Sequence, residues 1–489
     1  ALSAARAATS PSATPPAGPT PRHRGRTVLV VTGVLVVVAL LAGAVGWGLE
    51  EVRRGAERSG GAAAVPLVPA QSDPGTSSSA ASRRIVVQGG DDTDPSQQLV
   101  REALADVDAF WRRNFARVSS EPYRTVEGGF VAFGDGTRAP CTDDQSVVRG
   151  NAYYCTEADV IAWDAVNLVP GLRERFGDLG VGLVFAHEWG HAVQLRAGVV
   201  DRPTIFLEQQ ADCYAGAWVA DARRRDDAFK VTPAALDRAM SGFLTLRDPV
   251  GLTDSSTPGA HGSAFDRIRA FQEGVSDGVE RCAGYQLDKL PLVARGFTSL
   301  EDQATGGNLP LAEALDATTT DLGSFWPGVA RSLGAPSFRA PRTELVDDPS
   351  CDGGVRLAGR VRYCPSEGTV QVQRRNATVA HDAIGDFAMS TLVGAGWAAA
   401  GLAQSDRPPP AGARRQEAVD CLNAAWARTV FDGSRQDAQF SLSPGDLDEA
   451  VRTLLETTSA ADRSSTGSGF DRVTAYRRGF VEGSSACVR

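Results

Sequence analysis

The sequence predicts an α+β protein that is predominantly helical and contains two similar domains. The clearest apolar periodicity is helical, and strand-like runs such as GGFVAFG at 128–134 are few. The segment EQQADCYAGAW at 208–218 is similar to a second segment, QEAVDCLNAAW, at 416–426. A hydrophobic fraction of 42% over 489 residues suffices for two or three buried cores. The helical segments that we predict are 99–117, 179–195, 206–225, 232–246 and 264–279.

The N-terminal part of the chain predicts a membrane anchor. Residues 27–49 carry no charged side chain, and at 1.5 Å per residue they would cross a hydrocarbon core of about 30 Å as a helix. We expect residues 1–26 to form a disordered cytoplasmic tail and residues 50–92 a flexible linker. The alternative is a cleaved signal peptide with small residues at 42–44, but its apolar region usually spans only about 7–15 residues.

Charge and cysteine content restrict the partners and the compartment. The formal net charge of −9 offers no basic surface, so we expect no nucleic-acid partner. All eight cysteines follow the predicted anchor, and an even set of this kind fits an oxidising compartment. We therefore predict a single-pass protein of the cell membrane whose C-terminal domains lie outside the cytoplasm.

The chain repeats itself over most of its length. Near the C-terminal end of each half, residues 263–282 align with 468–487 and share an FDR motif and a final cysteine. Matches of this kind in the same order predict two copies of one domain, 93–290 and 296–489, which we expect to contact each other. At an offset of 208 residues, four further pairs coincide: Trp189 and Trp397, Asp212 and Asp420, Cys213 and Cys421, and Trp218 and Trp426.

Each copy holds four cysteines, so we expect disulfide bonds within copies. Four cysteines allow three pairings, and the sequence does not exclude the other two. The pairing that we favour closes one short and one long loop in each copy. These predicted bonds are Cys141–Cys155, Cys213–Cys282, Cys351–Cys364 and Cys421–Cys487.

The motif HEWGH at 187–191 predicts a metal site in the first copy. Positions i and i+4 share one face of a helix, so His187 and His191 can reach a single ion while Glu188 lies beside them. Imidazole nitrogen and carboxylate oxygen favour Zn²⁺, which keeps an open position for water in catalytic sites. The alternative is that His187 and His191 are two ordinary helix histidines that bind no metal. The acidic residues of the next predicted helix argue against it.

The helix predicted at 206–225 supplies the remaining acidic groups. Glu208 is placed to be the third zinc ligand. Asp212 lies one turn further along the same face, where it can accept the free N–H of a zinc-bound imidazole and so orient the ring. A solvated helix carboxylate would be the ordinary interpretation of Glu208 without the neighbouring motif.

The second copy lacks the predicted zinc ligands and the base, but it keeps the tryptophan, cysteine, glycine and aspartate residues expected to pack the core, form disulfides and make turns. Because all the predicted ligands and the base are replaced together, we predict that the second copy is metal-free. At the offset of 208, His187, Glu188, His191 and Glu208 fall on Ala395, Gly396, Ala399 and Gln416.

The motifs YYC, AHEWGHAVQ, EQQADCYAGAW and HGSAFDR resemble those of the bacterial putative neutral zinc metallopeptidases over roughly residues 130–285. The arrangement is also similar to the wider gluzincin group. The resemblance implies a zincin-like domain with His187, His191 and Glu208 as ligands, Glu188 as base and Asp212 as support for a ligand histidine. Thr156 departs from the family, which usually has proline after the aromatic-cysteine pair.

The resemblance and the motif together predict a membrane-anchored peptidase that hydrolyses a peptide or protein substrate. Zinc would activate a water molecule, and Glu188 would act as general base and then protonate the leaving amine. A developing oxyanion needs a further donor, for which His261 is our candidate because no other histidine remains in the first copy. A turn histidine without a catalytic part is the alternative for His261.

Two other functions fit the same sequence. The protein could be a catalytically idle, zinc-binding scaffold at the cell surface, with both copies binding partners. It could also be a zinc amidase that acts on a cell-wall amide. Zinc binding together with the effect of Glu188→Gln on hydrolysis distinguishes these alternatives.

Overall fold

The computed structural model describes most of the chain from residue 85 onward and has an α+β, mainly helical fold, as predicted. The predicted tail 1–26 and anchor 27–49 lie outside the described residues, as does most of the predicted linker. None of the helices within the described part is both long and apolar enough to cross a membrane. The described residues are 85–488 without positions 135, 226–228, 252–259, 407, 439, 458–462 and 464.

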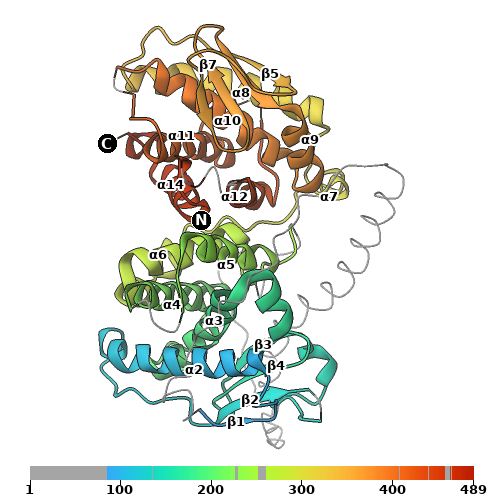
Figure 1. The fold of residues 1–489 in the computed structure, drawn as a ribbon, viewed down its shortest axis with the longest axis vertical. Coiled ribbons are helices and arrows are strands. Elements are labelled where there is room, and N and C mark those ends of the chain that lie inside the picture. The colour runs from blue at the N-terminus through green and yellow to red at the C-terminus, as the bar shows by residue number, and fades with distance from the viewer. Residues whose placement is uncertain are drawn as a thin grey trace, which may run out of the picture.

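The first half contains a four-stranded sheet in the order β1-β2-β4-β3 (Figure 1). Strand β2 lies parallel to both β1 and β4, whereas β3 is antiparallel to β4 and forms the edge of the sheet. The prediction of a flexible linker over residues 50–92 is therefore wrong for residues 87–88, because they form a strand that pairs with β2. The strands are β1 (Val87–Gln88), β2 (Gly129–Phe133), β3 (Ala152–Cys155) and β4 (Val160–Asp164).

The first half has five described helices, which correspond to the five predicted helical segments. In α3 the chain kinks at Gly177, whose φ of 73° lies in the left-handed region that glycine tolerates best. Helix α3 then continues through the HEWGH motif and packs against α4. The helices are α2 (Pro95–Asn114), α3 (Val169–Arg196), α4 (Thr204–Arg225), α5 (Pro233–Thr245) and α6 (Ala264–Ala283), with short 3₁₀ turns η2 (Phe115–Arg117), η3 (Gln145–Val148) and η4 (Leu287–Lys289).

The second half has a four-stranded sheet of related but not identical layout, in the order β5-β8-β7-β6. Like β2 and β4, β5 and β8 are parallel, and β7 pairs antiparallel with β8 as β3 does with β4. The additional strand β6 pairs antiparallel with the outer edge of β7. The strands are β5 (Arg342–Val346), β6 (Val355–Leu357), β7 (Val361–Cys364) and β8 (Thr369–Gln373).

The second half has seven described helices, two more than the first. Helix α10 lies on the sheet, α11 packs against α10 and α14, and α8 covers α10 from the other side. The described helices are α7 (Leu300–Thr305), α8 (Leu311–Ser332), α9 (Arg374–Ala383), α10 (Asp386–Ala403), α11 (Ala413–Phe431), α12 (Asp446–Glu456) and α14 (Gly469–Glu482), followed by the 3₁₀ turn η5 (Ser484–Ala486).

In each half a tryptophan–aspartate hydrogen bond joins two long helices, α4 to α2 in the first half and α11 to α8 in the second. In the first half, Trp218 Nε1 donates to Asp106 Oδ2 of α2 at 2.8 Å. In the second half, Trp426 Nε1 donates to Asp321 Oδ1 of α8 at 2.7 Å. Both indoles are fully buried, so each needs a partner for its N–H.

The disulfide prediction is confirmed, since all four favoured bonds are present and no described cysteine is free. The bond between Cys213 and Cys282 joins α4 to α6, and that between Cys421 and Cys487 joins α11 to the C-terminal segment. Closing loops of 69 and 66 residues restricts the unfolded chain, worth about 4 kcal/mol each on a chain-entropy model.

The two halves exchange helix caps at their interface, where α5 and α6 face α12 and α14 (Figure 1). Asp237 of α5 accepts the backbone N–H groups of Gly469 and Phe470 at the start of α14, at 3.0 and 2.8 Å. Asp448 of α12 accepts the N–H of Phe265 at the start of α6, at 2.8 Å. Each half thus satisfies helix-terminal donors of the other.

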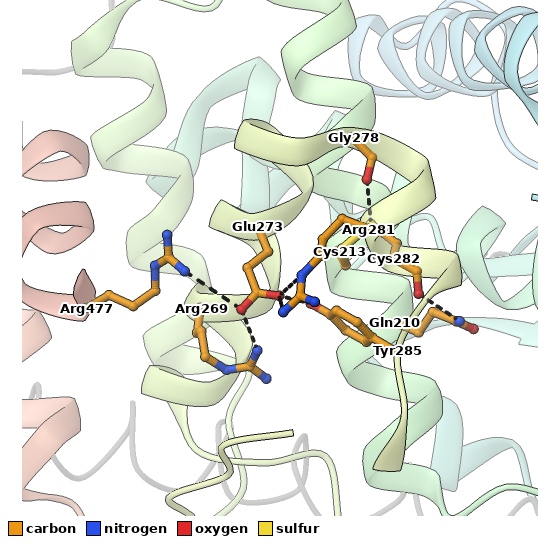
Figure 2. The surroundings of a disulfide bond; sticks show 9 residues. All are labelled: Gln210, Cys213, Arg269, Glu273, Gly278, Arg281, Cys282, Tyr285 and Arg477. Atoms are coloured by element: carbon orange, nitrogen blue, oxygen red, sulfur yellow. Dashed lines mark hydrogen bonds and ion pairs between the residues drawn. A yellow bond between two sulfur atoms is a disulfide. The ribbon is translucent and has the colours of Figure 1, made fainter. Parts of the chain in front are cut away.

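A buried carboxylate beside the first long disulfide adds a charged contact between the halves (Figure 2). Glu273 of α6 accepts from Arg269 at 2.8 Å, from Arg281 at 2.9 Å and from the hydroxyl of Tyr285 at 3.0 Å. Arg477 of α14 approaches the same carboxylate at 3.7 Å. Several cationic donors therefore compensate the burial of Glu273.

Candidate metal centre

The close approach of α3 and α4 depends on a glycine within the HEWGH motif. A Cβ atom at Gly190 would lie 2.9 Å from the Cα atom of Ala211 on α4. A side chain at this position would force the two helices apart. The glycine therefore offsets its unfavourable helix propensity of about 1 kcal/mol by bringing the two helices into register.

The structure brings together His187 and His191 of α3 and Glu208 of α4. The two Nε2 atoms lie 3.2 Å apart, and they lie 3.2 and 3.4 Å from the two carboxylate oxygens of Glu208. Tetrahedral ligands at about 2.0–2.1 Å from zinc are separated by roughly 3.3 Å, so one ion fits among these donors. Two imidazoles and a carboxylate also suit zinc chemically.

Each imidazole is oriented through its other nitrogen. The Nδ1 atom of His187 lies 2.8 Å from Asp212 Oδ1. Asp212 is itself held by Arg267, whose Nε and Nη2 donate to the two carboxylate oxygens at 2.8 and 2.9 Å. Burial opposes ionisation of Asp212, but the guanidinium holds its pKa below the ordinary value. A proton on Nδ1 leaves Nε2 of His187 as the free donor for a metal.

Gln194 performs the equivalent task for His191, and the sequence did not identify it. Gln194 Oε1 lies 2.9 Å from His191 Nδ1, while its amide nitrogen donates to the carbonyl of Leu207 at 2.7 Å. The second bond fixes the orientation of the amide and ties it to the start of α4. Its position three residues after His191 on one helix was the available signal.

Glu188 lies beside the three donors and faces the edge strand β3. Its Oε2 atom accepts the backbone N–H of Tyr154 at 2.9 Å. Only 8% of the residue is exposed, and this burial raises the pKa of the carboxyl although both imidazoles oppose the shift. A carboxyl group with a raised pKa next to an open metal position is suited to accept and return a proton.

His261 is held at the start of α6 and interacts electrostatically with Glu208. Asp248 accepts from the backbone N–H groups of His261 and Gly262 at 2.7 and 2.9 Å, and its Oδ1 lies 2.9 Å from His261 Nδ1. Burial opposes protonation of His261, yet the charges of Glu208 and Asp248 raise its pKa. The structure places His261 outside the group of three ligands but with its Nε2 atom free of the Asp248 contact.

The second half holds both ends of the segment that carries His261. Asp448 Oδ2 forms an ion pair with Arg247 at 2.6 Å, directly before Asp248. Asp448 Oδ1 accepts from Phe265, four residues after His261. One side chain of the second half therefore anchors the segment beside the candidate site.

The corresponding place in the second half is filled by packing and amide groups. A Cβ atom at Gly396 would lie 2.2 Å from the side chain of Val370, so no base could occupy this position. Gln416 donates to Asp420 Oδ1 at 3.0 Å and accepts from the N–H of Ala358 at 3.1 Å. Asp420 retains a bidentate pair with Arg472 at 2.8 and 3.1 Å. The amide thus replaces the imidazole as the partner of this aspartate.

Comparison with known proteins places the first half in a family. The model of the family described as "Putative neutral zinc metallopeptidase" matches residues 23–285. The uncharacterized protein YpfJ from Escherichia coli strain K12, and its counterpart from strain CFT073, are each 25% identical over 211 residues, covering 38% of this chain and 69% of the relative. No solved structure matches the chain significantly. The chain belongs to the putative neutral zinc metallopeptidase family.

Proposed function

We propose that the protein is a zinc peptidase that acts outside the cytoplasm and is anchored to the membrane by residues 27–49. The observation that carries this proposal is the convergence of His187, His191 and Glu208 around one point, with Glu188 buried next to it. The four disulfides support an oxidising compartment. The anchor itself rests on the apolar run of the sequence.

In the proposed reaction, different residues of the first half bind the metal, transfer the proton and stabilise the oxyanion. His187, His191 and Glu208 would hold zinc, which supplies Lewis acidity and lowers the pKa of water. Glu188 accepts the proton of the attacking water and delivers it to the leaving amine. His261, oriented by Asp248, donates a hydrogen bond from Nε2 to the oxygen of the scissile carbonyl as negative charge develops there.

The free edge of β3 favours an extended peptide as the substrate. Within the described residues β3 pairs only with β4, and the N–H of Tyr154 points away from β4 toward Glu188. An extended segment can add to such an edge through backbone hydrogen bonds, which places its peptide groups beside the base. This edge supports a peptide over a cell-wall amide attached to a sugar.

We further propose that the second half is a degenerate copy of the first, retained as a supporting domain. The similar sequence segments, the equivalent disulfides and the buried Asp–Arg pair in each half support the duplication. The contact of Asp448 with Arg247 and Phe265 supports a role in holding the segment of His261.

Metal content and proteolysis of the intact chain in detergent test the proposal. Zinc is measured by mass spectrometry, alongside cleavage of an unstructured protein and of peptidoglycan. We expect one zinc per chain and cleavage of the protein, retained in the control Glu174→Gln on the exposed part of α3. Glu188→Gln should keep zinc and lose cleavage.

Three other results would contradict the proposal in whole or in part. Zinc binding by the parent without hydrolysis of either substrate would favour the idle scaffold. Release of peptide from peptidoglycan without cleavage of protein would favour the amidase. Loss of zinc in Glu188→Gln would contradict the separation of ligand and base.

A further inference from the structure

A second group of oxygen donors lies in the second half, remote in sequence from the HEWGH motif. Asp386 begins α10, Asp446 begins α12, and Glu449 lies one turn into α12. One carboxylate oxygen from each residue lies within 4.8 Å of the others. Asp386 and Asp446 are only 2% and 3% exposed. Three carboxylates therefore share one small, buried space.

Backbone N–H groups donate to each of the three carboxylates. The N–H of Leu309 donates to Asp386 Oδ2 at 2.9 Å, and the N–H of Phe387 donates to Glu449 Oε2 at 3.0 Å. The N–H of Ser443 donates to an oxygen of Asp446. These bonds fix the orientation of the three groups but leave Asp386 Oδ1 without a described donor.

The remaining oxygen of Asp386 is an unpartnered buried acceptor. Asp386 Oδ1 has no hydrogen-bond partner and is shielded from solvent. Leaving such an atom without a partner costs about 1–3 kcal/mol, and more if the group is charged. Among the described residues, no arginine, lysine or histidine forms an ion pair with any of the three carboxylates, although the charges of Arg295, His381 and Arg247 each act on one of them from a greater distance. This differs from Glu273, which several arginines surround.

We propose that Asp386, Asp446 and Glu449 bind a divalent cation of the calcium type. All three donors are carboxylate oxygens, which hard cations prefer and zinc does not require. Oxygens at 2.3–2.6 Å from Ca²⁺ can lie up to about 5 Å apart, whereas those at 2.0–2.1 Å from Mg²⁺ reach only about 4.2 Å. The three oxygens lie within 4.8 Å of one another, and the long, flexible bonds of calcium accommodate any separation up to that limit.

The cation would join segments that are distant in sequence. Asp386 is bound to the connection before α8 through Leu309, while Asp446 and Glu449 belong to the helix that reaches toward the first half. Neutralising the repulsion among these groups would stabilise the ends of α10 and α12. The cation site is structural and independent of hydrolysis.

Calcium titration of the zinc-loaded full chain in detergent tests this site. Isothermal titration calorimetry with CaCl₂ at pH 8 should report one site, with a Kd on the order of 0.1–1 mM as in extracellular modules. At 5 mM CaCl₂ the Tm should rise by roughly 1–3 °C. MgCl₂ at the same concentration should give a smaller shift.

Matched variants assign the response to these residues. Asp386→Asn and Glu449→Gln should each remove the calcium heat and the Tm shift, and should melt no lower than the calcium-free parent because repulsion is reduced. Asp178→Asn, at the aligned position of the first half, should keep both. No calcium response in the parent would overturn the proposal and leave protons as the neutralising groups. An unchanged response in both variants would also overturn it.

Discussion

The first and second halves of this chain keep the same framework and differ where chemistry would occur. Both have a tryptophan–aspartate bond, a disulfide that closes a long loop and a buried aspartate–arginine pair. Within the part of the chain that the structure describes, only the first half has two imidazoles and a carboxylate facing one point. The comparison separates residues that hold the fold from residues that serve the metal.

The two halves also differ at the sheet edge that borders this point. Strand β3 leaves its outer edge unpaired among the described residues, whereas β6 covers the same edge of β7. An unpaired edge strand exposes backbone donors and acceptors that another strand can use. The half with metal donors is therefore also the half with an open edge.

The largest expected effect comes from giving the first half the amide that the second half carries. Glu208→Gln should lower zinc affinity by more than about 100-fold and abolish proteolysis, because it removes a ligand rather than a group that orients one. Equilibrium dialysis with zinc and a cleavage assay measure both. Gln416→Glu should bind no second zinc, since no imidazoles lie near it. A second bound zinc would show that the framework alone creates the site.

His261 should affect turnover without affecting the metal. His261→Ala should lower kcat by about 10²–10³, the usual cost of removing an oxyanion donor, while zinc content and KM stay unchanged. His381→Ala in the second half provides the matched control and should retain full kcat. An unchanged kcat in His261→Ala would assign this residue to the turn alone.

The two buried aspartate–arginine pairs should contribute equally to the free energy of unfolding, but only the pair in the first half should affect zinc affinity. Asp212→Asn and Asp420→Asn each leave a buried arginine without its charged partner, which should cost about 3 kcal/mol of unfolding free energy. Only Asp212→Asn should weaken zinc binding, by about 10–100-fold, because Asp212 orients His187. Chemical denaturation and zinc titration test the pair. Equal zinc affinities would remove Asp212 from the metal site.

The exchanged helix caps provide the smallest and most specific comparison. Asp448→Asn and Asp237→Asn should each cost about 1–2 kcal/mol of unfolding free energy through weakened capping. Asp448→Asn should also lower kcat about tenfold at unchanged KM and zinc content, because Asp448 anchors the segment of His261. Steady-state kinetics distinguish the variants. If both lose kcat equally, the effect is general destabilisation.

Local sequence patterns predicted much of this arrangement. Helical periodicity located the helices that carry His187 and Glu208, and the repeated cysteines gave the disulfide pairing. Several residues that act through tertiary contacts were not predicted. Asp248 reaches His261 across 13 residues, and Tyr154 reaches Glu188 across 34. Strand β6 was also missed, because three residues carry too little periodicity to identify a strand.

Zinc stoichiometry of the intact chain tests the central claim most directly. Inductively coupled plasma mass spectrometry after removal of loosely bound metal should give one zinc per chain. The count should fall to zero in His187→Ala and remain one in His381→Ala, which leaves the first half unchanged. Two zinc ions per chain, or one zinc retained after His187→Ala, would contradict a single metal centre in the first half.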